Sequence, residues 1–212
     1  MKTEDLIATL AADDTAPKVP LTRALWLALG GSAVVAGLVW LMMLGPRHDF
    51  MPAMHTVRFV FKFVVTFALA LTAALVIFPM SQPYDRPSRY RPLLLLAPVL
   101  LLLAIGAELA MIPSSAWMKV WMGHNAMVCM SSIPVIAAVP LGLMLYAIRQ
   151  GAPARPARAG AIAGLIAGGI AAFFYAAHCF DDSPLFVATW YTIAIGVVTT
   201  VGALVGGRVL RW

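Results

Sequence analysis

The chain has 212 residues, of which 62% are hydrophobic and only 11% are charged, and its formal net charge is +6. With a mean hydropathy of +0.89, this composition excludes an ordinary soluble globular domain and indicates a protein whose solvent is the lipid bilayer. Basic membrane loops account for most of the positive charge, so we expect no direct binding to nucleic acid.

The amino-terminal part of the chain differs in character from the rest. Residues 1–23 are mostly polar and are expected to form a cytoplasmic segment, whereas residues 24–212 are expected to form the membrane domain. Because acidic residues precede the first apolar stretch, we expect no cleaved signal peptide and an uncleaved first span. Residues 14–20 contain two prolines, which is typical of an extended linker.

A short amphipathic helix is predicted over residues 3–12. Three apolar side chains fall on one face of this helix: Leu6, Ile7 and Leu10. Glu4 and Asp5 suit its first turn, because the amino end of a helix is electropositive. A helix of this length is marginal in water, so we expect it to form against a partner or the membrane surface.

Six apolar stretches follow, each of about 20 residues, the length that a helix needs to cross roughly 30 Å of hydrocarbon. They lie at about residues 24–44, 59–79, 92–112, 126–147, 159–179 and 185–205. The expected fold is therefore all-α, a polytopic membrane protein with six transmembrane helices. The fifth stretch carries a small residue at every fourth position (Gly160, Gly164, Gly168, Ala172 and Ala176). This ridge predicts close packing against another helix.

Lys and Arg residues are distributed unevenly between the two sides of the predicted membrane. Eleven of the fifteen lie on one side: Lys2, Lys18, Arg23, Arg86, Arg89, Arg91, Arg149, Arg155, Arg158, Arg208 and Arg211. The other side has Arg47, Arg58 and Lys119, together with Lys62, which we expect to extend outward from the second span. Because short basic loops resist translocation, this split predicts that both termini are cytoplasmic. The arginine clusters could also bind lipid headgroups or an acidic partner, although topology alone explains them.

Two cysteines are the only thiols of the chain, and the topology places both near the outer surface. Cys129 falls in the first turn of the fourth span and Cys179 at the end of the fifth, so a disulfide can form if their α-carbons are within about 7 Å. Further possible ligands lie at the same level: His124, His178, Asp181, Asp182 and Glu108. Thiolates with imidazoles favour zinc, copper(I) or cadmium. The spacing leaves a second interpretation open, in which both cysteines are ordinary small buried residues.

Glu108 is the acidic residue that falls inside a predicted span. An ionised carboxylate within a bilayer costs on the order of 3 kcal/mol, so a partner is expected, and His124 or Lys119 in the next outer loop would serve. The alternative is a partly solvated helix end with no special role.

Catalytic signatures are absent from the sequence. It has no phosphate-binding loop, nucleophile elbow or HExxH motif, so we expect a protein that is not an enzyme and that needs no cofactor. The aromatic residues near the outer boundary, including Tyr191, are interpreted as interfacial anchors. Two alternatives stay open: a small transporter that uses Glu108, and a thiol redox enzyme, although the latter would need a second reactive cysteine pair.

Three separated segments resemble the NrsF family, six-pass bacterial membrane anti-sigma factors named as negative regulators of the sigma factor SigF. They are residues 2–13 (KTEDLIATLAAD), 149–160 (RQGAPARPARAG) and 178–191 (HCFDDSPLFVATWY). The segments match in order, and the number of helices and one cysteine in each of the fourth and fifth spans match as well.

This resemblance implies a function and a partner. The partner would be an extracytoplasmic-function (ECF) sigma factor, held inactive at the inner membrane. The amino-terminal segment would bind it, with Leu6, Ile7 and Leu10 as apolar contacts and Asp5 beside them. Cys129 and Cys179 match the paired cysteines by which the family is thought to sense heavy-metal or oxidative stress. Their modification would shift the fourth and fifth spans between two states that differ in sigma binding.

Overall fold

The computed structural model describes residues 3–12, 19–82 and 88–211, and within these ranges the chain is helical, with no strand. The helices are α1 (Thr3–Ala12), α2 (Leu21–Met43), α3 (Phe50–Ala53), α4 (Val57–Met80), η1 (Arg91–Leu95), α5 (Leu96–Met111), α6 (Ser114–Met122), α7 (Ala126–Arg149), α8 (Pro156–Ala176), α9 (Pro184–Phe186), η2 (Val187–Tyr191) and α10 (Thr192–Val209). The predicted all-α class is confirmed.

Six helical segments in the described part of the chain are long and apolar enough to cross a membrane. They are Leu21–Met43, Val57–Met80, Arg91–Met111, Ser114–Arg149, Pro156–Ala176 and Pro184–Val209. Each overlaps one predicted span. The third combines η1 with α5, the fourth combines α6 with α7, and the sixth combines α9, η2 and α10. The predicted six-span architecture is therefore confirmed, with ends that differ by a few residues.

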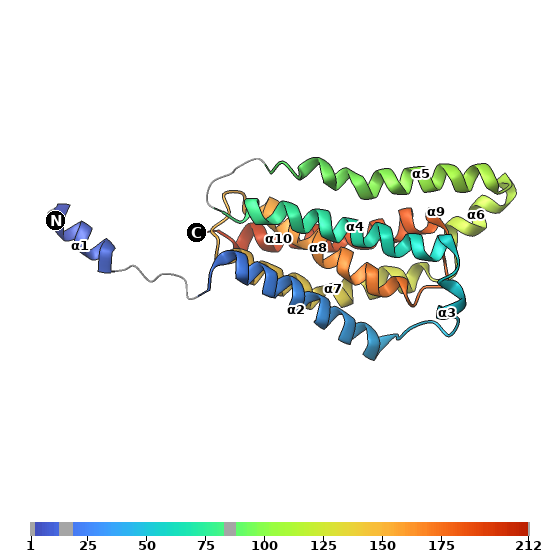
Figure 1. Ribbon diagram of the computed structural model, residues 1–212, viewed down its shortest axis with the longest axis horizontal. Coiled ribbons are helices and arrows are strands. Elements are labelled where there is room, and N and C mark those ends of the chain that lie inside the picture. The colour runs from blue at the N-terminus through green and yellow to red at the C-terminus, as the bar shows by residue number, and fades with distance from the viewer. Residues whose placement is uncertain (1–2, 13–18, 83–87, 212) are drawn as a thin grey trace.

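Helix α8 forms the centre of the bundle and packs against α10, α4, α7 and α2. Its side chains are mostly small, and a continuous series of them is buried. Helix α5 lies at the edge, where its main neighbours are α4 and α9 (Figure 1). Most of the α5 surface is therefore exposed to the surrounding medium, which in a membrane is lipid.

The predicted ridge of small residues is the contact surface between α8 and α10. A Cβ atom added to Gly160 would lie 2.1 Å from the carbonyl oxygen of Gly202, and one added to Gly206 would lie 2.7 Å from the Cα of Gly160. Gly164 and Gly168 continue the contact toward Thr199 and Ile195 of α10. The two backbones approach this closely because no side chain separates them.

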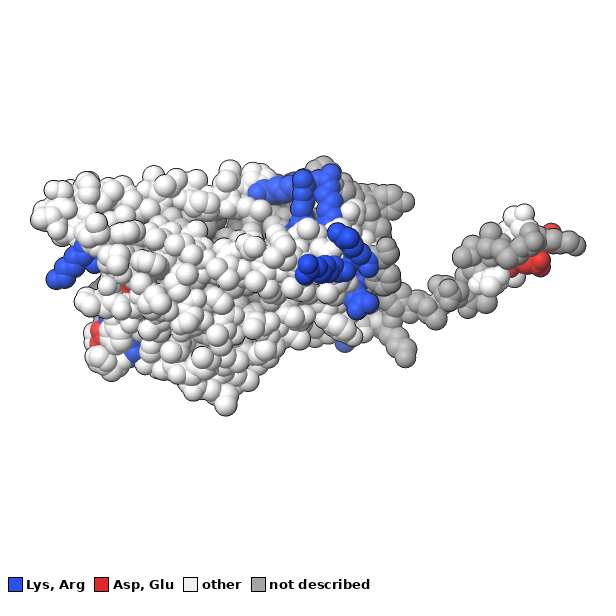
Figure 2. All heavy atoms as spheres, turned by 180° about the vertical axis from the view of Figure 1, so that it is seen from behind, with Lys and Arg blue, Asp and Glu red and all other residues white. Residues whose placement is uncertain are grey.

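The two ends of the bundle carry different charges. We call one the basic end, because its described residues include Arg23, Arg89, Arg91, Arg149, Arg155, Arg158, Arg208 and Arg211. Figure 2 shows blue Lys and Arg side chains gathered at one end of the bundle. The opposite end, formed by residues 45–62, 108–129 and 176–191, we call the cysteine end. The carboxyl terminus and α1 both lie toward the basic end (Figure 1).

The amino-terminal helix has the bounds that the sequence predicted, Thr3–Ala12. It lies apart from the six-helix bundle (Figure 1). The side chain of Ile7 is 60% exposed, whereas the side chains of Leu6 and Leu10 lie outside the description. Most of the predicted linker, and the loop residue Arg86, also lie outside the described residues.

Candidate functional site

Cys129 and Cys179 come together at the cysteine end of the bundle. Cys129 lies in the first turn of α7, where its N–H donates to the carbonyl oxygen of Asn125 at 2.8 Å; Cys179 follows α8, and its N–H donates to Tyr175 at 3.1 Å. Both side chains are fully buried and both thiols are free. Both belong to one buried cluster of the core. The predicted pair therefore lies in the same part of the bundle, as two thiols and not as a disulfide.

Two tyrosines surround this thiol pair. The rings of Tyr175, on α8, and Tyr191, in the π-helical turn η2, are 5.6 Å apart and buried. Both interact with the Cys179 thiol, yet neither hydroxyl has a hydrogen-bond partner of normal geometry. A buried hydroxyl without a partner costs free energy. These hydroxyls are therefore placed to donate a hydrogen bond to a thiolate or to an oxidised sulfur.

Sequence reasoning did not find this tyrosine pair. It passed over Tyr175 and interpreted Tyr191 as an interfacial anchor, whereas the structure buries Tyr191 against the thiols. A tyrosine one turn before Cys179 on an otherwise apolar helix was a usable signal, because a buried hydroxyl needs a polar neighbour.

The residues that follow Cys179 attach it to three other parts of the bundle. We call residues 177–183, which connect α8 to α9, the anchor segment. Three consecutive side chains in it, Asp181, Asp182 and Ser183, each bind a different element. Any change at Cys179 is therefore coupled to several helices at once.

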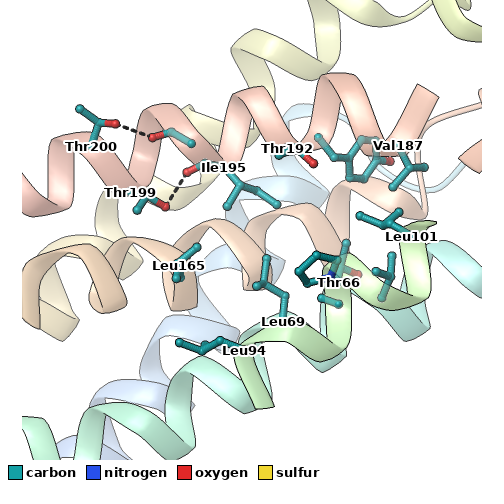
Figure 3. Close-up of a pocket in the computed structure, with 15 residues that line it drawn as sticks. Thr66, Leu69, Leu94, Leu101, Leu165, Val187, Thr192, Ile195, Thr199 and Thr200 are labelled. Atoms are coloured by element: carbon teal, nitrogen blue, oxygen red, sulfur yellow. Dashed lines mark hydrogen bonds between the residues drawn. The ribbon is translucent and has the colours of Figure 1, made fainter. Parts of the chain in front are cut away.

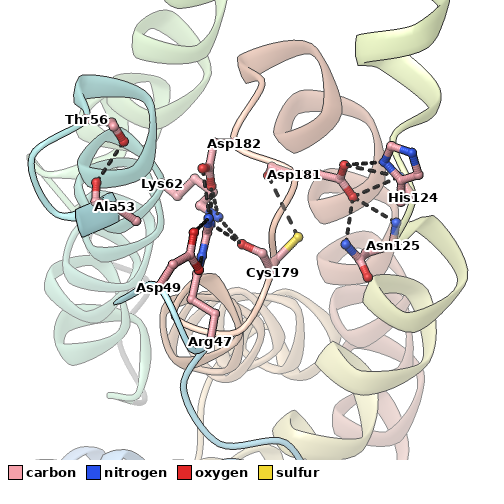
Figure 4. Close-up of polar contacts among 10 residues, drawn as sticks. All are labelled: Arg47, Asp49, Ala53, Thr56, Lys62, His124, Asn125, Cys179, Asp181 and Asp182. Atoms are coloured by element: carbon pink, nitrogen blue, oxygen red, sulfur yellow. Dashed lines mark hydrogen bonds and ion pairs between the residues drawn. The ribbon is translucent and has the colours of Figure 1, made fainter. Parts of the chain in front are cut away.

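Asp181 caps the amino end of α7, the helix that carries Cys129. Its carboxylate accepts hydrogen bonds from the backbone N–H groups of His124 and Asn125 and from the Asn125 side-chain amide, at 2.8–3.1 Å (Figure 4). A carboxylate at this position also suits the positive end of the helix dipole. Gly123, with φ +57°, makes the turn before the cap, and a Cβ there would lie 2.7 Å from Cγ of Asp181. The cap holds the two cysteine-bearing segments together.

Asp182 is held by two cations that also bind the backbone of Cys179. The Nζ of Lys62 lies 2.6 Å from Oδ1 of Asp182 and 2.8 Å from the carbonyl oxygen of Cys179. The guanidinium of Arg47 lies 3.1 Å from Oδ2 of Asp182 and 3.3 Å from the same carbonyl oxygen (Figure 4). The expectation that Lys62 extends outward is wrong, because its side chain is fully buried. A carboxylate and a carbonyl oxygen offset the cost of burying its charge.

Two titratable groups that lie outside the spans at this site have shifted pKa values. Arg47 donates two hydrogen bonds to Asp49 and holds the pKa of that carboxyl at about 2. Burial raises the pKa of the Cys179 thiol, and the nearby charge of Lys62 partly opposes this shift. Since the raised pKa keeps the proton on sulfur at neutral pH, Cys179 is a thiol in the resting protein.

Ser183 attaches the anchor segment to the outer end of α5. Its hydroxyl donates to Oε2 of Glu108 at 2.6 Å, and the N–H of Leu185 donates to the same oxygen at 3.2 Å. Arg58 completes the site, with Nη2 3.3 Å from Oε1 of Glu108. The carboxyl group is buried, so the interpretation of a partly solvated helix end is wrong, and the partners are not the expected His124 or Lys119. Glu108 thus joins α5 to the cysteine end.

The predicted auxiliary ligands do not converge on the thiols. Nδ1 of His178 lies 3.1 Å from the carbonyl oxygen of Gly45, and the exposed ring of His124 lies 3.6 Å from Asp181. Within the described ranges, no group of three or more His, Cys, Asp or Glu side chains is arranged to hold a metal ion. Of the predicted set, Cys129 and Cys179 are the residues that share one buried cluster.

Comparison with known proteins gives a consistent family. The family model described as "Negative regulator of sigma F" matches residues 10–212. The probable anti-sigma-F factor NrsF of Azospira oryzae is 34% identical over 220 aligned positions, and the anti-sigma-F factor NrsF of Caulobacter vibrioides is 34% identical over 219. Each alignment covers all of both chains. No solved structure matches the chain.

Proposed function

Because the chain belongs to the NrsF family of negative regulators of sigma F, we propose that it is an inner-membrane anti-sigma factor that holds an ECF sigma factor inactive. In this proposal the basic end faces the cytoplasm, as the excess of arginine there favours. The amino-terminal segment then lies on the same side as the transcription machinery, and the cysteine end faces the periplasm.

The amino-terminal helix α1 is the proposed sigma-binding element. It stands apart from the bundle (Figure 1), and Ile7 is exposed, so that within the described residues its side chain is not buried against another helix. With Leu6 and Leu10 on the same face and Asp5 at its edge, α1 has the form of an amphipathic helix that binds in an apolar groove. The sigma factor would supply that groove.

The proposed signal is heavy-metal or oxidative stress at Cys129 and Cys179. A two-electron oxidant would take two electrons and two protons from the thiols as the S–S bond forms. A soft metal ion would displace the same protons and bind both sulfurs. A disulfide needs the sulfur atoms to approach to about 2 Å of each other, and a metal ion fixes both at its own bonding distance; in this proposal each event moves the backbone of Cys179.

The observation that carries the sensing proposal is the attachment of the anchor segment. Asp181 binds α7, Asp182 binds Lys62 of α4, and Ser183 binds Glu108 of α5. A movement of Cys179 therefore reaches three membrane-spanning helices, each of which continues to the basic end. Differential binding of sigma to the two arrangements would release it.

Membrane recruitment of a sigma factor tests the first half of this proposal. The sigma factor is expressed with the wild-type chain and with the variant Ile7→Asp/Leu10→Asp, and its share in the membrane fraction is measured. The matched control is Ala8→Asp/Ala12→Asp, which adds the same charge to the opposite face of α1. Recruitment by wild type and control but not by the apolar-face variant supports the proposal. A sigma factor that stays soluble with the wild type contradicts it.

The transporter alternative has less support from the site. Glu108 is bound by Ser183, Leu185 and Arg58 at a helix end, and the cavity beside α5 does not include it. A carboxylate with three partners is better suited to holding helices together than to binding a transported ion.

A further inference from the structure

An apolar cavity of about 450 Å³ lies between α5 and the inner bundle. Its walls include Leu94 and Leu101 on the η1–α5 side, Leu69 of α4, Leu165 of α8, and Gly196 and Thr200 of α10 (Figure 3). The hydroxyl of Thr200 donates to the carbonyl oxygen of Gly196 at 2.8 Å, so it is already satisfied within its own helix. The cavity therefore offers contact area to a hydrocarbon and little to water.

The cavity is elongated along the bundle. Its lining extends from Val187 to Thr200, roughly 20 Å of helix at 1.5 Å per residue. All of its walls belong to the membrane-length segments, so it lies at the depth of the hydrocarbon core. A long, narrow apolar space at this depth has the shape of a single extended chain.

A cationic pocket of about 290 Å³ lies at the basic end, between the start of α8 and the end of α10. It is lined by Arg155, Pro156, Ala157, Arg158, Gly207 and Arg211. Arg158 and Arg211 are exposed. The acidic residues described in the bundle all lie at the cysteine end: Asp49, Glu108, Asp181 and Asp182. Among the described residues, the charges that line the pocket are therefore all positive, and the amino end of α8 adds to this positive potential.

The apolar cavity and the cationic pocket lie on one face of the same two helices. Arg158 is seven residues, two helical turns, before Leu165 on α8, and Gly207 is seven residues after Thr200 on α10. Seven residues of helix span roughly 10 Å. The cationic pocket is thus in line with the cavity and about 10 Å beyond its end, at the level where lipid phosphates meet water.

We propose that these two features form one binding site for an anionic phospholipid. One acyl chain fills the cavity between α5 and the bundle, and the phosphate lies against Arg158 and Arg211. The positive charge of the cationic pocket matches the phosphate of such a lipid, and the apolar cavity matches its acyl chain. Basic pockets between membrane helices on the side of the positive charge are suited to anionic headgroups.

Lipid retention measured by native mass spectrometry tests this site. The protein is purified from bilayers containing equal amounts of phosphatidylglycerol and phosphatidylcholine, and the bound lipid is weighed. We expect wild type to retain about ten times as much phosphatidylglycerol as phosphatidylcholine, since each arginine at the surface contributes to binding an anionic lipid. Arg158→Gln/Arg211→Gln is expected to lose that preference. Gly196→Leu is expected to lose bound lipid of both kinds, because its side chain projects into the cavity.

Matched variants separate this site from general effects. A Cβ at Gly196 meets no atom within 4 Å, and the same holds for Gly142, so Gly142→Leu adds equal bulk elsewhere. Arg89→Gln/Arg149→Gln removes the same charge from the basic end outside the pocket. Both controls are expected to retain lipid as wild type does.

Three outcomes would overturn the proposal. Equal lipid retention by all variants means that there is no site. If Arg158→Gln/Arg211→Gln loses the preference for phosphatidylglycerol but Gly196→Leu retains as much lipid as wild type, a headgroup binds without its acyl chain in the cavity. If Arg158→Gln/Arg211→Gln retains lipid as wild type does but no longer recruits the sigma factor, the cationic pocket binds protein instead.

Discussion

The fully buried ammonium group of Lys62 lies 2.8 Å from the carbonyl oxygen of Cys179. A cation of α4 therefore holds the backbone of a residue that follows α8. Because the same Nζ lies 2.6 Å from Asp182, Lys62 fixes the anchor segment at two points on either side of Phe180. The position of the thiol therefore depends on this side chain as well as on the hydrogen bond from the Cys179 N–H to Tyr175 of α8.

Replacing Lys62 by Met should loosen the anchor segment while keeping the length of the side chain. Asp182 would keep its ion pair with Arg47 but lose the shorter one with Lys62. We therefore expect the free energy of unfolding to fall by about 3 kcal/mol. Thermal unfolding in detergent measures this loss. Lys119→Met, at the same end of the bundle, is the control, and an equal effect of both substitutions would contradict the assigned role.

The reactivity of Cys179 should rise with pH. Burial raises the pKa of its thiol, so at pH 7 the thiolate fraction is below that of an ordinary cysteine, whose pKa is about 8.5. The fraction then increases as the pH approaches the raised value. Maleimide labelling of the Cys129→Ser variant in detergent measures the rate. A cysteine introduced at exposed Ser131, in a chain without the two native cysteines, should label faster at every pH; equal rates would refute the prediction.

The sequence predicted the parts of the fold that depend on local pattern. Six apolar stretches gave six spans because span length is set by the bilayer, which acts on each helix independently. The ridge beginning at Gly160 predicted that this span packs closely against another helix, since closely approaching helices need small residues at every fourth position. Neither prediction required knowledge of which helices are neighbours.

The site was predictable only in part. The shared side of the membrane placed Cys129 and Cys179 at one level, and the bundle brings them together. The role of Lys62 was missed, because a lysine near the end of a span normally extends to water. Here the anchor segment supplies both acceptors instead, the carboxylate of Asp182 and the carbonyl oxygen of Cys179. The partners of Glu108 were missed because Ser183 lies 75 residues away in the chain and has no periodic signal.

Substitutions of Glu108 should separate hydrogen bonding from charge. Gln can still accept from Ser183 and Leu185, whereas Leu leaves both donors buried without a partner. We therefore expect Glu108→Leu to destabilise the protein by about 2 kcal/mol and Glu108→Gln by less. Hydrogen exchange of residues 183–187, with thermal unfolding, measures both. Arg58→Gln should change the stability only slightly, because the Arg58 side chain is half exposed. If it destabilises the protein more than Glu108→Leu does, the ion pair contributes more than the two hydrogen bonds, which contradicts the prediction.

Adding one methyl group at Gly160 should disrupt the centre of the bundle. The new Cβ would lie 2.1 Å from the carbonyl oxygen of Gly202, and backbone cannot move aside as a flexible side chain can. We expect Gly160→Ala to cost at least about 2 kcal/mol. Gly142→Ala, where the Cβ meets nothing within 4 Å, should be neutral or slightly stabilising, since alanine favours a helix. Similar unfolding curves for the two variants would show that α8 and α10 can separate without loss.

The final prediction concerns the signal. If oxidation or metal binding at the two thiols releases the sigma factor, Cys129→Ser/Cys179→Ser should still recruit sigma to the membrane but should no longer release it under stress. Serine keeps the size of cysteine and forms neither a disulfide nor a bond to a soft metal ion. A sigma-dependent reporter, measured with and without cadmium or an oxidant, gives the readout. Tyr175→Phe/Tyr191→Phe, which removes the two hydroxyls beside Cys179, should raise the stress level needed for release, because an oxidised or deprotonated sulfur loses two potential donors. Full induction in the double serine variant, with sequestration intact, would place the sensor elsewhere in the chain.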